Sequence, residues 1–219
     1  MRFIFNVIEL YRERTAFFLD LLLEHIYLTG VAILFITIIG VSLGVLMTYH
    51  KGVANTVLSL TNFFYTIPSI AMFGFLVTFT GIGNTPAIIA LTIYGVLPVI
   101  RNTYVGISEI DDTIIEAATG MGVTVRQLLF KIQLPLALPV IIAGFRTMVI
   151  MTIALGGIAS FIGAGGLGIA IWRGISNNHN ELIAAGSLLV ALLAVITDLV
   201  LNFIERGIRI KIYGTAKER

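Results

Sequence analysis

The sequence predicts an all-α, polytopic membrane protein with about five transmembrane helices, and a sixth if residues 153–172 insert partway into the bilayer. Of the 219 residues, 58% are hydrophobic and only 12% are charged, about half the charged share of a soluble domain. Long apolar runs reach the roughly 20 residues that cross the hydrocarbon core. They lack the alternation of a half-buried strand. Lipid is therefore the expected solvent.

Five apolar runs provide the expected spans. They cover residues 26–47, 57–79, 81–100, 140–162 and 182–204. Pro68 and Pro98 stand inside the second and third runs, where we expect kinks. Arg146 and Asp198 are the only charges that interrupt a run, in the fourth and fifth. Charges inside a membrane are usually paired or functional.

The N-terminal residues 1–24 mix apolar and charged side chains. This segment is too short and too charged to span, and we expect an amphipathic helix in the membrane interface. It does not resemble a cleaved signal peptide, because the apolar run that follows is about twice the usual length. Residues 25–210 are the expected transmembrane domain and residues 211–219 a cytoplasmic tail.

The distribution of Lys and Arg predicts the orientation, since cytoplasmic loops collect these residues. With five spans and an inner C-terminus, nine of them lie inside and four outside. The inner set is Lys51, Arg101, Arg126, Lys131, Arg206, Arg209, Lys211, Lys217 and Arg219, and the outer set is Arg2, Arg12, Arg14 and Arg173. We therefore expect an outer N-terminus and an inner C-terminus.

Several functions are excluded by composition and spacing. The chain has no cysteine, which rules out disulfides and thiolate metal sites. His25, His50 and His179 are isolated, so no metal site is expected. A net charge of +2 is too weak to indicate nucleic acid. The glycines at 163, 165 and 168 match a dinucleotide fingerprint, but no strand precedes them; they predict a tight, flexible outer loop.

Residues 102–134 carry most of the polar chemistry. Thr113 precedes Glu116 by three residues, and Thr124 precedes Gln127 by three; both are capping-box spacings. Glycines at 120 and 122 lie between them, where a helix must end. The loop therefore predicts two short helices on the cytoplasmic side. Alanines at 117 and 118 leave one surface of the first helix open to another protein's backbone.

This loop resembles the cytoplasmic coupling loop of binding-protein-dependent ABC importer permeases, here placed at residues 105–134. The pattern EAA-x3-G-x9-I-x-LP matches without gaps. Its residues are Glu116, Ala117, Ala118, Gly122, Ile132, Leu134 and Pro135. The segments at 65–69, 97–104 and 161–168 are similar to those of the osmoprotectant branch, which includes permeases for glycine betaine, carnitine and choline.

The resemblance implies a type I ABC importer transmembrane domain in the bacterial cytoplasmic (inner) membrane. It implies a pair of membrane subunits, homo- or heterodimeric, cytoplasmic ABC ATPase subunits and an extracytoplasmic substrate-binding protein. ATP hydrolysis would belong to the partner, since the chain has no phosphate-binding loop, and no cofactor is expected. Substrate would cross by alternating access between outward- and inward-open states.

Two further features have both a functional and an ordinary reading. Arg146 and Asp198 either pair with one another or each reach water separately. The proline kinks are either ordinary packing or part of a passage in which aromatic faces hold a quaternary ammonium. The candidate passage residues are Tyr65, Thr66, Pro68, Ser69 and Tyr94.

Two other classes of function compete with the importer permease. An ion-coupled secondary carrier or channel would want several intramembrane acids and an internal repeat. Only Asp198 qualifies, and no repeat is evident. An intramembrane enzyme would need a catalytic constellation, which is missing.

Overall fold

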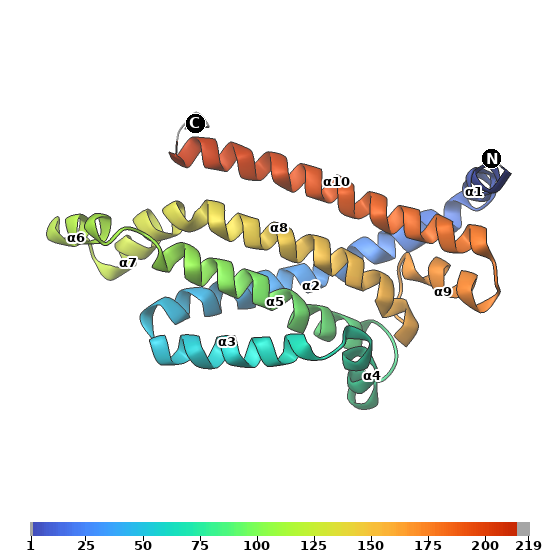
Figure 1. Ribbon diagram of the computed structural model, residues 1–219, viewed down its shortest axis with the longest axis horizontal. Helices are drawn as coiled ribbons and strands as arrows, with labels where there is room; N and C mark the ends of the chain where they lie inside the picture. Colours follow the sequence, from blue (N-terminus) through green and yellow to red (C-terminus); the bar gives the residue numbers. More distant parts are fainter. Residues whose placement is uncertain (1, 214–219) are drawn as a thin grey trace.

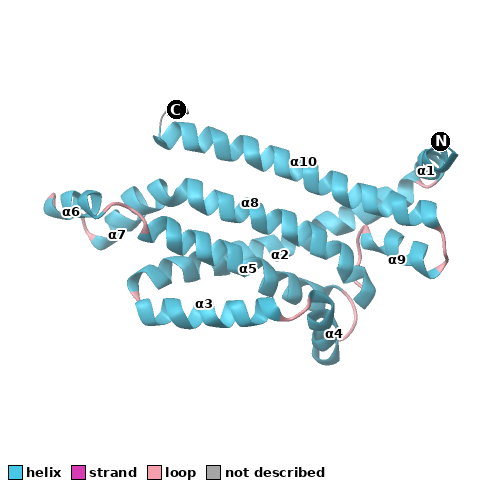
Figure 2. Cartoon of the chain, viewed as in Figure 1, coloured by secondary structure: helices cyan, strands magenta, loops and turns pink. Residues whose placement is uncertain are grey.

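The computed structural model describes residues 2–213, and over that range it contains helices and turns but no strand (Figure 1, Figure 2). The all-α class predicted from hydropathy is confirmed. In chain order the helices are α1 Arg2–Glu13, α2 Thr15–Tyr49, α3 Lys51–Thr66, α4 Ser69–Thr80, α5 Asn84–Ser108, α6 Asp112–Gly120, α7 Val125–Leu128, the π-helix η1 Leu129–Gln133, α8 Leu134–Ala159, the 3-10 helix η2 Ser160–Ile162, α9 Gly168–Ser176 and α10 Asn180–Tyr213.

Four segments of the described chain are long and apolar enough to cross a membrane, and the bent pair α3–α4 makes a fifth if it counts as one span. The four are Thr15–Tyr49, Asn84–Ser108, Val125–Ile162 and Asn180–Ile212. The expected sixth segment, residues 153–172, is divided among α8, η2 and α9. Because α9 has only nine residues, it is too short to span.

The long helices lie side by side and alternate in direction, which separates two ends of the bundle (Figure 1). The α6 end carries α6, α7 and the turn between α2 and α3. The α9 end carries α1, α9 and the start of α10. The predicted coupling loop and the N-terminus therefore lie at opposite ends, as an odd number of passes requires.

The second predicted span, residues 57–79, is not one helix. Helix α3 begins at Lys51 and ends at Thr66, and α4 leaves it at an angle of 98°. Pro68 lacks an N–H and disfavours helical backbone in the residue before it, and Ile67 is accordingly extended, with φ −75° and ψ 127°. The expected kink is a sharp break, and α4 turns across the bundle (Figure 1).

Pro98 has a much smaller effect, because α5 continues through it as a single helix. The carbonyl of Pro98 accepts a hydrogen bond from Asn102 Nδ2 at 2.8 Å. The third span is therefore continuous through its proline, unlike the second.

Glycines bring the central helices α2, α5 and α8 into close contact. A Cβ added at Gly40 of α2 would lie 2.7 Å from Val99 Cβ of α5, and one at Gly44 would lie 2.5 Å from Thr103 Cβ. Between α5 and α8, a Cβ at Gly144 would lie 2.5 Å from Asn102 Cβ. Small residues let membrane helices approach closely, because packing rather than hydrophobicity drives their association. These three helices form the closely packed centre of the bundle.

The N-terminal and C-terminal boundaries differ from those expected. Helix α2 begins at Thr15, so residues 15–24 are continuous in one helix with the first apolar run. Helix α1 is held against α10, where Tyr11 Oη donates to the Ala185 carbonyl at 2.7 Å. Helix α10 continues to Tyr213, and residues 214–219 of the expected tail lie outside the described residues.

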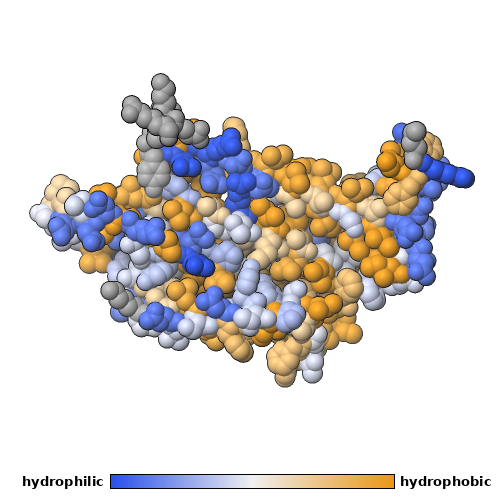
Figure 3. All heavy atoms as spheres, in the orientation of Figure 1, coloured by the Kyte–Doolittle hydropathy of each residue, from blue (hydrophilic) through white to orange (hydrophobic). Residues whose placement is uncertain are grey.

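The surface is largely apolar, as expected for a chain in lipid (Figure 3). The clearest apolar face belongs to α10, where every exposed residue from position 188 to position 204 is apolar. Its large members are Leu188, Leu192, Val195, Ile196, Leu199, Val200, Phe203 and Ile204.

Candidate functional site

The coupling-loop motif has a local structural explanation around Gly122. Helix α6 ends at Gly120, and Gly122 adopts φ +80°. The Val123 N–H donates to the Ala118 carbonyl at 3.3 Å, and the Gly122 N–H donates to the Thr119 carbonyl at 2.9 Å. These two bonds form a Schellman motif, which favours glycine at the left-handed position. The glycine four residues after Ala118 therefore ends the helix that carries Glu116.

The caps of the two short helices differ from each other. Thr124 and Gln127 form the predicted capping box on α7. On α6 the predicted pair of Thr113 and Glu116 is wrong, because Asp111 is the cap and accepts from the Thr113 backbone and side chain at 2.9 and 2.7 Å. These hydrogen bonds, the side-chain one foremost, hold the pKa of Asp111 below its ordinary value.

Not every residue of the motif faces solvent. Glu116 and Ala117 are exposed, but Ala118 is only 2% exposed and faces its own chain. The expectation that both alanines form an open surface is therefore wrong for the second. Ile132 lies in η1, and Leu134 and Pro135 begin α8. Around them, several large apolar side chains project from the loop. They are Ile114, Met121, Val125 and Phe130.

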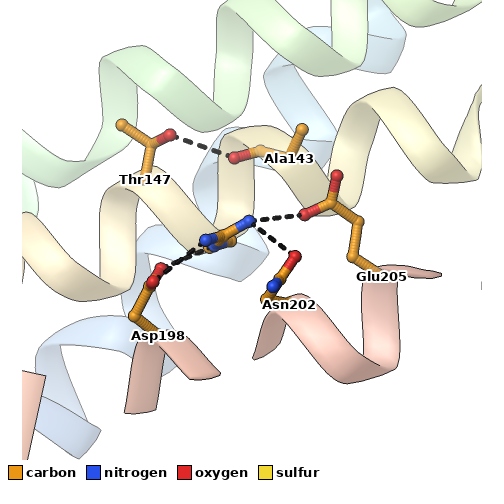
Figure 4. A network of polar contacts seen from close by, with 6 residues as sticks. Ala143, Thr147, Asp198, Asn202 and Glu205 are labelled. Carbon is orange, nitrogen blue, oxygen red and sulfur yellow. Dashed lines mark hydrogen bonds and ion pairs between the residues drawn. The ribbon is translucent and has the colours of Figure 1, made fainter. Parts of the chain in front are cut away.

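The structure brings Arg146 of α8 and Asp198 of α10 together in a bidentate ion pair (Figure 4). Arg146 Nε lies 2.6 Å from Asp198 Oδ1, and Nη2 lies 2.9 Å from Oδ2. Parallel N–H···O bonds of this kind combine charge with a fixed geometry. Of the two readings left open by the sequence, pairing within one chain is the one observed.

The same guanidinium holds two more side chains that sequence reasoning missed. Arg146 Nη1 lies 3.2 Å from Asn202 Oδ1 and 3.2 Å from Glu205 Oε2 (Figure 4). Their spacing in the sequence could have indicated this cluster, because Asp198, Asn202 and Glu205 stand at i, i+4 and i+7 on one helical face. One cation of α8 therefore joins three successive turns of α10. We call these four residues the α8–α10 clamp.

The candidate passage residues separate into two groups at the α3–α4 break. Tyr65 and Thr66 are exposed, whereas Tyr94 is only 5% exposed. The Tyr94 hydroxyl donates to the Ile67 carbonyl, and its ring meets that of Tyr65 at a centroid distance of 5.9 Å. Tyr94 therefore supports the break from within the core rather than lining a surface. Pro68 is exposed and Ser69 is half-buried.

The glycine loop at the α9 end, which the sequence predicts to be tight and flexible, makes hydrogen bonds to α2 and α5. The Gly166 N–H donates to Glu24 Oε2 at 3.0 Å, and the Gly165 N–H donates to Asn84 Oδ1 at 3.1 Å. The Gly83 N–H also donates to the Ile162 carbonyl at 3.1 Å. Helices α2, α5 and α8 are thereby joined at this end.

The histidines serve the fold. His25 is fully buried, with Nε2 3.1 Å from the Ile153 carbonyl. His179 Nδ1 accepts from the Leu182 N–H at 3.0 Å. Among residues 2–213 with described side chains, no group of three or more His, Cys, Asp or Glu is arranged to hold a metal ion.

The arrangement of spans and loop matches a known family. Residues 17–210 match the family described as "Binding-protein-dependent transport system inner membrane component". The chain belongs to this family. It is an integral membrane permease subunit of an ABC importer, and ATP hydrolysis belongs to a separate subunit. The family match selects this function over an ion-coupled secondary carrier or channel.

Curated relatives and solved structures agree with this assignment. The chain is 39% identical to the glycine betaine/carnitine/choline transport system permease protein OpuCD of Bacillus subtilis (strain 168), over 90% of this chain and 87% of the relative. It is 38% identical to the osmoprotectant import permease protein OsmW of Salmonella typhimurium, over 90% of this chain and 96% of the relative.

Among solved structures, the fold is similar to a chain of the MetNI methionine ABC transporter in an inward-facing conformation. The TM-score is 0.78 at 25% identity, over 87% of this chain and 95% of that chain. The type I importer fold inferred from the coupling-loop motif is confirmed.

Proposed function

We propose that this permease imports osmoprotectants that carry a quaternary ammonium group, such as glycine betaine, carnitine or choline. Two relatives that match nine-tenths of the chain are permeases named for these compounds or for osmoprotectants. The chain adds an exposed tyrosine, Tyr65, beside the α3–α4 break. An aromatic face attracts a quaternary ammonium without a counter-ion.

The substrate proposal is tested by uptake in proteoliposomes that contain the permease, its ATPase and its binding protein. We expect ATP-dependent accumulation of labelled glycine betaine, carnitine or choline, and competition among those that are transported. Methionine serves as the control substrate. Accumulation of methionine with none of the three quaternary amines would contradict the proposal.

We propose that the ATPase docks on the exposed face of α6, around Glu116 and Ala117. The support is a short capped helix that projects from the bundle (Figure 1) and carries an exposed acid with apolar neighbours, Met121 and Val125 among them. This places the α6 end and the end of α10 in the cytoplasm. A binding protein then docks at the α9 end, and a second permease subunit completes the passage.

We propose that the α8–α10 clamp keeps α10 attached to α8 while the bundle changes between its outward- and inward-open states. The support is geometric, since α10 otherwise presents an apolar face to lipid and one guanidinium joins three of its turns. A charge swap tests this role. We expect Arg146→Asp and Asp198→Arg each to reduce transport and the double variant to recover part of it. A double variant no better than either single one would count against the clamp.

A further inference from the structure

Helix α3 has an outer face unlike that of the other spans. Its inner face is apolar and packs on the core through Val53, Ala54, Val57 and Leu58. The opposite face is exposed and carries uncharged polar side chains, with two exposed apolar ones, Leu60 and Phe63, beside them. The polar residues are Asn55, Thr56, Ser59, Asn62 and Thr66. Figure 3 shows the pale and blue surface over this helix, in contrast to the orange surface over the middle of α10.

Hydrogen bonding divides these polar residues into two groups. Thr56 donates to the Gly52 carbonyl at 3.0 Å and Thr66 to the Phe63 carbonyl at 2.7 Å, so their hydroxyls are satisfied within the helix. The side chains of Asn55, Ser59 and Asn62 make no hydrogen bond within residues 2–213. We call these three residues the α3 stripe. Their spacing of four and three residues places them on one helical face.

The α3 stripe does not suit contact with lipid. At a rise of 1.5 Å per residue, Asn55 lies about 6 Å and Asn62 about 16 Å along the helix from Lys51. With Lys51 at the cytoplasmic boundary, as the proposed orientation has it, the stripe would reach from near that boundary to about the middle of a 30 Å hydrocarbon core. An amide or hydroxyl without a hydrogen bond in hydrocarbon costs several kcal/mol. Water or a polar partner must therefore face it.

The surface along the stripe is open and nearly flat. Asn55, Thr56, Ser59 and Leu60 line a shallow depression of about 550 Å³. No Asp, Glu, Lys or Arg occurs between positions 52 and 66. A permanent cation would therefore meet amide and hydroxyl dipoles but no carboxylate that would hold it firmly. Fast passage requires binding weak enough to release the solute.

We propose that the α3 stripe lines a water-filled passage through which the quaternary ammonium substrate crosses the cytoplasmic half of the membrane. The proposal rests on the substrate class proposed above and extends the candidate passage from Tyr65 and Thr66 toward the cytoplasm. Asn55, Ser59 and Asn62 contact water and substrate, and Leu60 borders them.

The natural absence of cysteine permits a direct test in the complete transporter. Asn55→Cys, Ser59→Cys and Asn62→Cys are made singly and treated with a charged, membrane-impermeant methanethiosulfonate reagent in inside-out vesicles. The matched controls are Leu192→Cys and Leu199→Cys, which are exposed on α10. A thiol reacts as the thiolate, which needs water. Thr56→Cys is a further variant on the same face.

We expect the α3 cysteines to react at least about tenfold faster than the α10 controls, and glycine betaine with binding protein and ATP to change that rate. Rates equal to the controls would overturn the proposal. Unreactive cysteines that instead form disulfides between permease subunits would also overturn it, because they would indicate a dry interface. Since reactivity is measured first without substrate, reactive cysteines without uptake of any quaternary amine would refute the substrate class alone.

Discussion

The two ends of the bundle each contain a left-handed glycine, but the glycines have different surroundings. At the α6 end, Gly122 has φ +80°, and no neighbouring atom lies within 4 Å of a Cβ built there. At the α9 end, Gly166 has φ +100°, and a Cβ would lie 2.9 Å from His25 Nδ1. The acids differ in the same way. Glu116 is exposed and makes no hydrogen bond within the described residues, whereas Glu24 accepts from the Gly166 N–H at 3.0 Å.

The difference shows what each end is built to do. The α6 end is held in shape by its own caps, and its acid and its large apolar side chains are exposed. At the α9 end, polar groups form hydrogen bonds that join α2, α5 and α8 to one another.

The largest expected effect is a loss of coupling on charge reversal at Glu116. We expect Glu116→Lys to reduce ATP-driven uptake about 100-fold, toward the upper range of coupling between sites, because in the proposed docking the acid faces the ATPase. Thermal stability in detergent should change little, as for other unbonded surface residues. The measurements are uptake and stimulated ATPase activity in proteoliposomes.

The control is Glu109→Lys, which makes the same charge change at another exposed acid of the loop that lies outside α6. Equal losses of uptake in the two variants would mean that net charge, and not the position of Glu116 on α6, decides coupling.

The two left-handed glycines should respond differently to alanine. Gly166→Ala adds left-handed strain and a clash with His25 and should lower the free energy of unfolding by about 2 kcal/mol or more. Gly122→Ala adds only the strain, about 1 kcal/mol, yet should reduce coupling more because it disturbs the end of α6. Unfolding in denaturant and coupled ATPase activity check the two halves. Equal destabilisation by the two alanine variants would contradict the idea that only the α9 glycine is closely packed.

A smaller effect is expected from the hydrogen bond between Asn84 and the glycine loop. Asn84→Ala leaves the Gly165 N–H without its partner and should lower the free energy of unfolding by about 1 kcal/mol. Asn177→Ala, at an exposed residue of the same end, is the control and should cost almost nothing. An unchanged melting temperature in the Asn84 variant would show that the loop is held by packing alone.

The smallest effect concerns the α6 cap. The pKa of Asp111 is lowered in the folded protein. The stabilisation that its carboxylate gives to the start of α6 is therefore complete above the ordinary Asp pKa of about 3.9, and it is lost as the pH falls through the folded pKa. We expect hydrogen exchange in α6, corrected for its intrinsic pH dependence, to become faster below about pH 4. Asp111→Asn should lack this dependence. The same acceleration in that variant would assign it to another group.

The sequence predicts the spans and the turn at Gly122 well, because apolar length and left-handed glycine are local properties. It predicts the break at Pro68 poorly. A proline inside a membrane run is compatible both with the uninterrupted α5 and with the 98° bend, and the outcome depends on distant partners, such as the Tyr94 hydroxyl on the Ile67 carbonyl.

Burial and partners of single side chains are equally non-local. The i, i+4, i+7 spacing of Asp198, Asn202 and Glu205 is visible in the sequence, but only the packing of α8 on α10 shows that one Arg146 serves all three. Likewise Ala117 and Ala118 are identical residues, and only the fold buries the second.

The coupling role of α6 is tested most directly by crosslinking in the assembled complex. A single cysteine at Ala117, exposed at the α6 end, is compared with one at Asn177, exposed at the α9 end, with a thiol-to-amine crosslinker and the complete transporter. We predict that Ala117→Cys crosslinks to the ATPase with a yield that changes on ATP addition, and that Asn177→Cys does not. Crosslinking of the ATPase through Asn177→Cys and not through Ala117→Cys would contradict the assignment of the α6 end as the coupling surface.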